Sequence, residues 1–132
     1  MINGKKIVLI VDDSILILER MIQLLDEVEN IQFVVHAASY NEAIELLNVL
    51  TPDLVLLDIH LPDKSGIELL RTIKEKYRDV KVFMITNNAN DFYRNRCKTY
   101  GADYFFDKSK DFNLLPQTIS AETACYPKHK TN

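Results

Sequence analysis

The sequence predicts a single α/β domain built on an open parallel β-sheet with helices on both faces. Two observations carry this prediction. Short apolar runs alternate five times with amphipathic stretches, and most of the runs are continuous, as strands buried on both faces require. The length of 132 residues suits one domain, and 47% hydrophobic residues argue against a disordered chain. We expect five strand–helix units with right-handed crossovers over residues 1–124 and a polar tail over residues 125–132.

The five expected strands are short and rich in β-branched or aromatic residues. They are Ile7–Val11, Phe33–His36, Leu54–Leu57, Val82–Ile85 and Tyr104–Phe106. None approaches the roughly 20 apolar residues of a membrane span, and no secretory signal precedes the first strand. We therefore expect a cytoplasmic protein that does not enter a membrane. Its two cysteines, Cys97 and Cys125, are expected to remain thiols there.

The first two helices have distinct signals at their ends. The first is expected over residues 14–28, with Ile15, Leu18, Ile22 and Leu25 on its buried face. The second begins at the capping box Ser39-x-x-Glu42, whose side chains satisfy free backbone N–H groups. It ends at Thr51-Pro52, because the residue before a proline disfavours helical geometry.

The remaining three helices follow the same logic. The third begins at a second capping box, Ser65-x-x-Glu68, and its inward residues are Ile67, Leu70, Ile73 and Tyr77. The fourth spans about residues 89–100 and stops at Gly101, which suits a left-handed cap. The last is expected to start near Asn113, because Pro116 fits only into the first turn of a helix.

Reactive side chains follow four of the five expected strands. In strand order they are Asp12 and Asp13, then Asp58, Thr86 and Lys108. Taken singly, each has an ordinary explanation, such as helix capping by Asp12 or a solvated Lys108. Ligands of open α/β sheets bind outside the carboxyl ends of the strands, however, so the joint placement predicts a site there. The remaining strand ends in His36, to which we assign no role.

The charges of this cluster predict a bound cation. Two carboxylates about 4 Å apart repel by about 4 kcal/mol at an effective dielectric constant near 20. Three carboxylates facing one lysine therefore need further positive charge, or one of them holds a proton. Hard oxygen ligands without a Cys/His set favour Mg²⁺, which also suits phosphate oxygens. The sequence thus predicts a Mg²⁺-dependent site for a phosphoryl group.

Four motifs resemble the receiver domain of two-component response regulators. They are Val11-Asp12-Asp13-Ser14, Leu56-Leu57-Asp58-Ile59-His60-Leu61-Pro62 followed by Ser65-Gly66, Met84-Ile85-Thr86, and Gly101-Ala102-Asp103-Tyr104-Phe105-Phe106-Asp107-Lys108. Each motif is modest alone, but four in this order are very specific, and the resemblance covers about residues 5–124. It implies a flavodoxin-like, doubly wound (βα)5 fold with a central five-stranded parallel sheet.

The resemblance also implies roles for the acidic cluster. Asp58 would be the phosphate acceptor. Asp12, Asp13 and Asp58, with the backbone carbonyl of His60, would hold Mg²⁺. Lys108 would pair with the phosphoryl oxygens.

A switch is implied by the same resemblance. The Thr86 hydroxyl would bind the phosphoryl group, and Phe105 would be the aromatic side chain that then rotates inward. Positions at which this family tunes phosphoryl lifetime are occupied by His60, Asn87 and Asn88. Two positions depart from the family pattern: Asn87 replaces a small residue, and Ser109 replaces a proline, which predicts a differently shaped loop after Lys108.

The function implied is that of a stand-alone phosphoacceptor in a phosphorelay. The donor would be a histidine kinase or phosphotransfer protein, and the phosphorylated surface would bind a downstream protein target. The chain would be a monomer or a phosphorylation-dependent dimer. It would not be an enzyme, beyond phosphorylating itself from small phosphodonors and dephosphorylating itself. The net charge of −3 argues against direct nucleic-acid binding.

Three alternatives use the same residues differently. A degenerate receiver would serve as a protein-interaction module without phosphorylation. An aspartate-nucleophile phosphatase would place a carboxylate two residues after the nucleophile, where this chain has His60. A flavin carrier would need a Ser/Thr/Gly-rich phosphate loop after the first strand, where Asp12-Asp13-Ser14 would repel a phosphate.

Overall fold

A five-stranded parallel β-sheet forms the centre of the computed structural model, which describes residues 5–87 and 89–123. Its strands are β1 (Lys6–Val11), β2 (Ile31–Ala37), β3 (Leu54–Leu57), β4 (Lys81–Thr86) and β5 (Tyr104–Asp107). They lie in the order β2-β1-β3-β4-β5, and every neighbouring pair is parallel. The chain therefore turns from one half of the sheet to the other between β1 and β3, and ligands bind at such a switch point.

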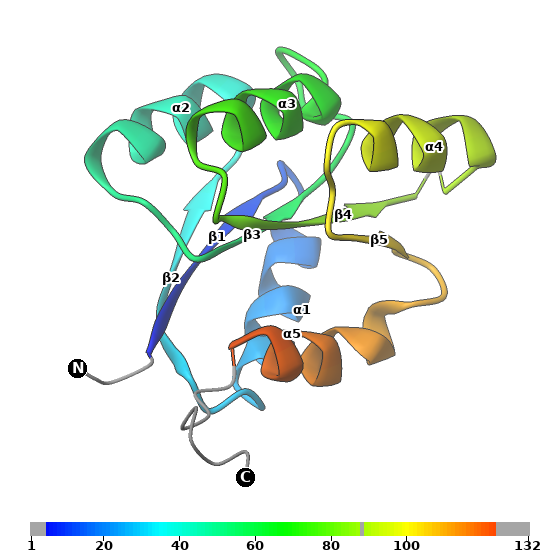
Figure 1. Cartoon of the computed structure of the whole chain (residues 1–132). Helices are drawn as coiled ribbons and strands as arrows, with labels where there is room; N and C mark the ends of the chain where they lie inside the picture. The colour runs from blue at the N-terminus through cyan, green and yellow to red at the C-terminus, as the bar shows by residue number, and fades with distance from the viewer. Residues whose placement is uncertain (1–4, 88, 124–132) are drawn as a thin grey trace, which may run out of the picture.

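Five helices cover the two faces of the sheet. They are α1 (Ile15–Leu25), α2 (Tyr40–Val49), α3 (Gly66–Lys76), α4 (Asp91–Thr99) and α5 (Leu115–Thr123), with one 3₁₀ turn at Phe112–Leu114 before α5. Figure 1 shows α2, α3 and α4 on one face and α1 and α5 on the other. This arrangement confirms the predicted flavodoxin-like, doubly wound fold. None of the described helices is long and apolar enough to cross a lipid bilayer.

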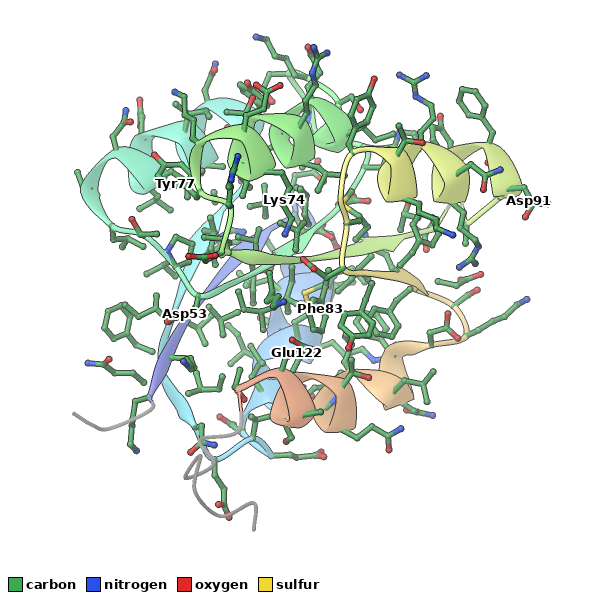
Figure 2. The ribbon with its side chains drawn as sticks, in the orientation of Figure 1. Asp53, Lys74, Tyr77, Phe83, Asp91 and Glu122 are labelled. Atoms are coloured by element: carbon green, nitrogen blue, oxygen red, sulfur yellow. The ribbon has the colours of Figure 1, made fainter. Side chains whose placement is uncertain are left out.

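Alternation along the inner strands divides the core into two layers. In β1, Leu9 and Val11 pack toward α2 and α3, whereas Val8 and Ile10 pack toward α1 and α5. All four are fully buried, as continuous apolar strands predict. Phe83 of β4 belongs to the second layer, and Figure 2 shows it between the sheet and α5. Both layers must form for the sheet to be covered.

The edge strand β2 departs from the predicted burial. It runs further than expected in both directions, and Phe33 is 44% exposed. Its apolar run predicts a strand covered on both faces, but β2 lies at the edge of the sheet and only β1 flanks it. An edge strand is covered less completely than the strands inside a sheet.

The predicted buried face of α1 is wrong in part. Ile15 is 66% exposed and Ile22 is 40% exposed, while Met21 and Leu25 are the buried residues of the helix. Apolar residues occupy more than one side of α1, so their spacing alone does not fix which side faces the sheet. The helix also ends at Leu25, three residues before the predicted end.

The helix caps are mostly as predicted. Ser39 Oγ accepts a hydrogen bond from the Glu42 backbone N–H at 3.1 Å, but the Glu42 carboxylate reaches back to Ala38 rather than to Ser39. Ser65 Oγ accepts from Ile67 N at 3.1 Å. Gly101, after α4, has φ of +95°, which confirms the left-handed cap.

Lys74 of α3 ties the amino ends of β4 and β5 to that helix. Lys74 Nζ lies 2.8 Å from both the Val80 carbonyl oxygen and Asp103 Oδ2. The same Asp103 oxygen accepts from the backbone N–H of Val82 at 2.8 Å. These contacts lie at the sheet edge opposite the strand ends that carry Asp12 and Asp58, so Lys74 is a useful internal reference for Lys108.

Candidate functional site

Three carboxylates meet where the neighbouring strands β1 and β3 end. Asp12 and Asp13 follow β1, and Asp58 follows β3. One carboxylate oxygen from each lies within 4.8 Å of the others. The pairing of β1 with β3 places Asp58 beside Asp12, because the Asp58 backbone N–H donates to Val11 O at 3.0 Å. Asp12 and Asp58 are buried and Asp13 is exposed, so the cluster opens to solvent on one side.

Lys108 brings one positive charge into this cluster. Its Nζ lies 2.7 Å from Asp12 Oδ2 and 3.2 Å from Asp58 Oδ2, and its side chain is only 5% exposed. The backbone N–H of Lys108 donates to Thr86 O at 2.9 Å, which fixes the end of β5 beside the end of β4. The prediction that separate loops bring acid and amine together is therefore confirmed.

Asp58 is ionised only at a cost in this environment. Burial raises the pKa of its carboxyl above the usual value, the charge of Lys108 opposes that effect only in part, and Asp12 adds to it. The carboxylate also receives hydrogen bonds from Lys108 and from the His60 backbone. With three carboxylates and one ammonium group, the cluster favours an additional cation.

A buried oxygen of Asp12 shows that the cluster fits a metal ion. Asp12 Oδ1 accepts from Ser14 N at 2.9 Å, but among the described residues the buried Oδ2 has no hydrogen-bond partner. Lys108 Nζ is close to that oxygen, yet the approach is that of an ion pair without hydrogen-bond alignment. A hard cation would satisfy this oxygen together with those of Asp13 and Asp58, so the cluster could hold a metal ion.

The loop between β3 and α3 is held close beneath Asp58. Gly66 N donates to Ile59 O at 2.6 Å, and a Cβ at Gly66 would collide with the Asp58 carbonyl oxygen. Further along, the Asp63 carboxylate accepts from the backbone N–H groups of Tyr40 and Asn41, at 2.9 and 3.0 Å, at the start of α2. The loop is therefore fixed at its end, by Gly66, and in its middle, by Asp63.

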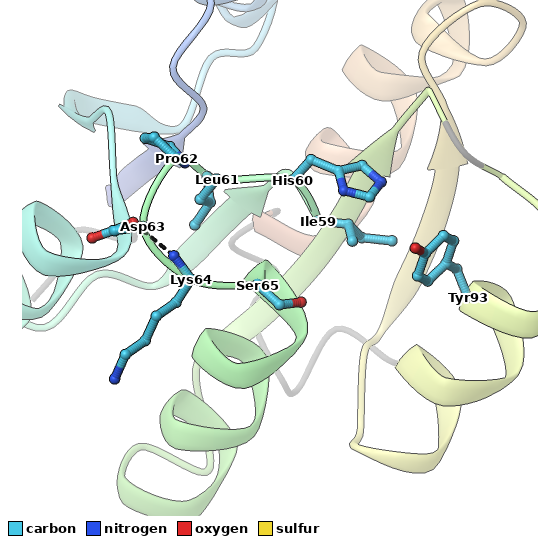
Figure 3. Close-up of a pocket in the computed structure, with 8 residues that line it drawn as sticks. All are labelled: Ile59, His60, Leu61, Pro62, Asp63, Lys64, Ser65 and Tyr93. Carbon is cyan, nitrogen blue, oxygen red and sulfur yellow. Dashed lines mark hydrogen bonds between the residues drawn. The ribbon is translucent and has the colours of Figure 1, made fainter.

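The same loop borders an open pocket of about 360 Å³. Figure 3 shows His60 and Tyr93 on facing sides of it, one from the loop and one from α4. Their rings meet edge to face with centres 5.5 Å apart. The exposed side chain of His60 thus touches α4, while its backbone lies beside Asp58.

The predicted switch residues lie on β4 and β5. Thr86 is fully buried at the end of β4, next to Asp107 across the strands. Phe105 is half-buried on β5, and the Arg94 guanidinium of α4 lies 4.6 Å from its ring centre. Asn87 is exposed, and Asn88 lies outside the described residues, as does the predicted tail over residues 125–132.

Two neighbours of the cluster were not assigned from the sequence. His36 Nε2 lies 2.9 Å from the backbone carbonyl oxygen of Asp12. Its place at the end of a strand was the available signal, but the pairing of β2 with β1 was needed to use it. Gly66 was noted only as part of a motif, and its close approach to Asp58 requires the folded backbone.

The chain is similar to known response regulators over most of its length. The family model of the response regulator receiver domain matches residues 8–120. The Fimbriae Z protein of Salmonella typhimurium is 34% identical over 112 residues, which are 85% of this chain and 53% of that protein. The response regulator GacA of Pseudomonas aeruginosa is 30% identical over 85% of this chain and 52% of its own length. The chain spans about half the length of the curated relatives it matches.

Solved structures show the same fold. A CheY-like response regulator receiver domain protein from Methanospirillum hungatei is 28% identical, with a TM-score of 0.78 over 90% of this chain and 94% of that one. A response regulator of the LuxR family from Aurantimonas sp. is also 28% identical, with a TM-score of 0.82 over 91% of this chain and 86% of that one.

The family match defines a receiver-type signalling domain rather than a classical enzyme. The chain belongs to the response regulator receiver domain family. The presence of the complete acidic cluster disfavours the degenerate receiver. Family membership also sets aside the flavin carrier.

Proposed function

We propose that Asp58 accepts a phosphoryl group and that this modification switches a protein-binding surface. The observation that carries the proposal is the position of the Asp58 carboxylate. It is buried within reach of the Lys108 amine on one side and of the Asp12 and Asp13 carboxylates on the other. Such a site suits transfer by positioning and charge neutralisation.

The transfer itself is a nucleophilic displacement. An Asp58 carboxylate oxygen attacks phosphorus and forms a new P–O bond. The bond from phosphorus to the imidazole nitrogen of a phosphohistidine, or to the acyl oxygen of a small phosphodonor, breaks, and its electron pair leaves with the donor. Lys108 Nζ, 3.2 Å from Asp58 Oδ2, would pair with the phosphoryl oxygens.

Four groups of this chain would hold Mg²⁺. They are the carboxylates of Asp12, Asp13 and Asp58 and the backbone carbonyl of His60. When bound, the ion would supply the positive charge that the transferring phosphoryl group needs. Asp12 Oδ2, which has no hydrogen-bond partner among the described residues, supports this assignment.

The switch would run from Thr86 to the surface of α4 and β5. The Thr86 hydroxyl would bind the new phosphoryl group and vacate space for Phe105 to turn inward. Phe105 would thereby leave Arg94, whose guanidinium lies over its ring. Phenylalanine has no hydroxyl, so the change would act through packing and through the position of Arg94. This is a two-state element biased by a local charge change.

The partners proposed are proteins. A histidine kinase or phosphotransfer protein would donate the phosphoryl group, and a downstream protein would bind the switched surface, with the chain a monomer or a phosphorylation-dependent dimer. His60, Asn87 and Asn88 would tune the phosphoryl lifetime. A cytoplasmic location belongs to the same proposal, and the free, buried thiol of Cys97 fits a reducing compartment.

Incubation with a small acyl phosphate and Mg²⁺ tests the proposal. Intact-mass spectrometry should show the addition of one phosphoryl group, which EDTA and Asp58→Asn should abolish. Asp53→Asn is the matched control, because Asp53 is an exposed aspartate at the other end of β3 whose carboxylate accepts from Ile7 N. No mass gain in the wild-type chain would instead support the degenerate receiver.

A further inference from the structure

A closed network of hydrogen bonds surrounds the backbone of Lys108. Asp107 Oδ1 accepts from the Ser109 backbone N–H at 2.8 Å and from the Ser109 hydroxyl at 2.6 Å. The Asp107 backbone N–H donates to Asp111 Oδ2 at 2.9 Å, and the Asp111 N–H returns to Asp107 O at 2.8 Å. The turn after β5 is thus fixed by the two residues that flank Lys108 and by Asp111.

The amine of Lys108 needs such a fixed origin. A lysine side chain has about 2 kcal/mol of rotamer entropy to lose when it is held in one position. Here it is 5% exposed and reaches from the end of β5 to the carboxylates after β1 and β3. Its backbone N–H is anchored to Thr86 O, on the side of β4. The bonds from Ser109 to Asp107 join the two residues that flank Lys108 and so close the turn around it.

We propose that Ser109 is a positioning residue for Lys108. Its hydroxyl closes the turn onto Asp107 and so directs the Lys108 amine between Asp12 and Asp58. Ser109 makes no contact with the carboxylate cluster among the described hydrogen bonds, and it acts through the backbone alone. The role of the Lys108 amine in phosphoryl transfer rests on the proposed function. The position of that amine between Asp12 and Asp58 does not, because it is part of the structure.

The bond from the Ser109 hydroxyl to the Asp107 carboxylate is short and lies at the protein surface. It joins a neutral donor to a carboxylate at 2.6 Å, and hydrogen bonds to ionised acceptors are shorter and stronger than neutral ones. That hydroxyl is also the main reason that the pKa of Asp107 lies below its usual value. Asp107 is therefore an ionised acceptor at neutral pH. Ser109→Ala removes the hydroxyl but keeps the backbone N–H bond.

The reactivity of the Lys108 amine measures its position directly. The full-length, metal-free chain would be acetylated with an N-hydroxysuccinimide ester, and the rate at each lysine read by peptide mass spectrometry. In Ser109→Ala, Lys108 should react about threefold to tenfold faster than in wild type, the effect expected from one lost hydrogen bond. Lys74, held by Val80 O and Asp103 at the opposite edge of the sheet, should be unchanged.

Two further variants separate positioning from general stability. Ser109→Thr keeps the hydroxyl and should return Lys108 to the wild-type rate. Ser39→Ala is the matched control, since it removes a serine that caps α2 and lies outside the Lys108 turn. The proposal is overturned if Lys108 reacts alike in wild type and Ser109→Ala, if Lys74 accelerates in parallel, or if the threonine variant reacts like the alanine variant.

A kinetic measurement distinguishes this proposal from the proposed function. With an acyl phosphate, Ser109→Ala should be phosphorylated about threefold to tenfold more slowly than wild type. Its Kd for Mg²⁺ should be no higher than that of wild type. A lower rate caused by weaker Mg²⁺ binding would contradict a role through Lys108. If the wild-type chain accepts no phosphoryl group, the proposed function fails, and the amine reactivities still decide the role of Ser109.

Discussion

At the scale of single residues, Asp58 is a charged group whose surroundings favour its neutral form. Burial raises its pKa, and the partial compensation by Lys108 leaves the carboxylate less stable in the fold than in water. Asp12 has a buried oxygen without a hydrogen-bond partner among the described residues. The three carboxylates of Asp12, Asp13 and Asp58 therefore repel one another, and a cation or the removal of one charge would relieve that repulsion.

Because its ionised form is unfavourable in the fold, replacing Asp58 by the neutral asparagine should not destabilise the metal-free protein. Between the ordinary pKa of an aspartate and the raised value, the folded state binds more protons than the unfolded state, so ionising Asp58 lowers the free energy of unfolding. The neutral variant should melt at or above the wild-type temperature in metal-free buffer at neutral pH.

With Mg²⁺ bound, wild type should melt at a higher temperature than Asp58→Asn. A ligand at 100 times its Kd adds about 2.7 kcal/mol to the free energy of unfolding. Wild type should gain close to this amount, and Asp58→Asn clearly less, because it lacks one of the three carboxylates. Thermal melts with and without Mg²⁺ measure both effects. A variant that melts well below wild type without metal would show that the Lys108–Asp58 ion pair outweighs burial.

At the scale of elements, the loop between β3 and α3 sets the geometry beneath Asp58. Its end lies against the Asp58 carbonyl at Gly66, and its middle is attached to α2 through Asp63. Both attachments are made by the backbone or to it, so they place the loop itself rather than one side chain. Changes in the loop should therefore affect the metal site before they affect the core.

Two glycine variants test this separation. Gly66→Ala puts a Cβ against the Asp58 carbonyl and should weaken Mg²⁺ binding about tenfold, the scale of changes just outside a metal's ligands. Gly101→Ala is the matched control. Its left-handed φ should cost about 1–2 kcal/mol of stability while Mg²⁺ affinity stays at the wild-type value. Isothermal titration and urea unfolding give both quantities, and normal Mg²⁺ affinity in Gly66→Ala would refute the role of the close approach.

The contribution of Asp63 to the free energy of unfolding should depend on pH. Desolvation alone would raise its pKa, but the backbone N–H groups of Asn41, Tyr40 and Lys64 together outweigh it and hold the pKa below its usual value. A lowered pKa stabilises the fold above the unfolded value of about 3.9, and this contribution disappears as the pH falls through the folded value. The stability difference between wild type and Asp63→Asn should therefore be constant near neutral pH and shrink below about pH 4. Urea unfolding across this range measures it, and a difference that grows toward acid would contradict the assignment.

At the scale of the whole molecule, parallel pairing in the order β2-β1-β3-β4-β5 brings separate loops to one edge of the sheet. The meeting of the strand ends at one edge could be predicted from the sequence, since polar residues after apolar runs mark where strands end, whereas the strand order itself comes from the structure. Asp12, Asp58, Thr86 and Lys108 follow or end their strands as expected. The rule that ligands bind at the carboxyl ends then located the site.

Other features depended on tertiary structure. The predicted buried side of α1 was wrong in part, because apolar residues occupy several sides of that helix and only packing against the sheet buries Met21 rather than Ile15. The contact of His36 with the Asp12 carbonyl depends on strand pairing. Ser109 was noticed as a departure from a family pattern, but its bond to Asp107 appears only when the turn is built.

Locating the phosphoryl group on the chain tests the role of Asp58 as the phosphate acceptor most directly. After reaction with an acyl phosphate and Mg²⁺, rapid digestion at low temperature and fragmentation of the peptides would identify the modified residue. We expect a single acyl phosphate on Asp58, with Asp12 and Asp13 unmodified. A phosphoryl group on any other residue, or Mg²⁺-independent labelling of Asp58, would contradict this expectation.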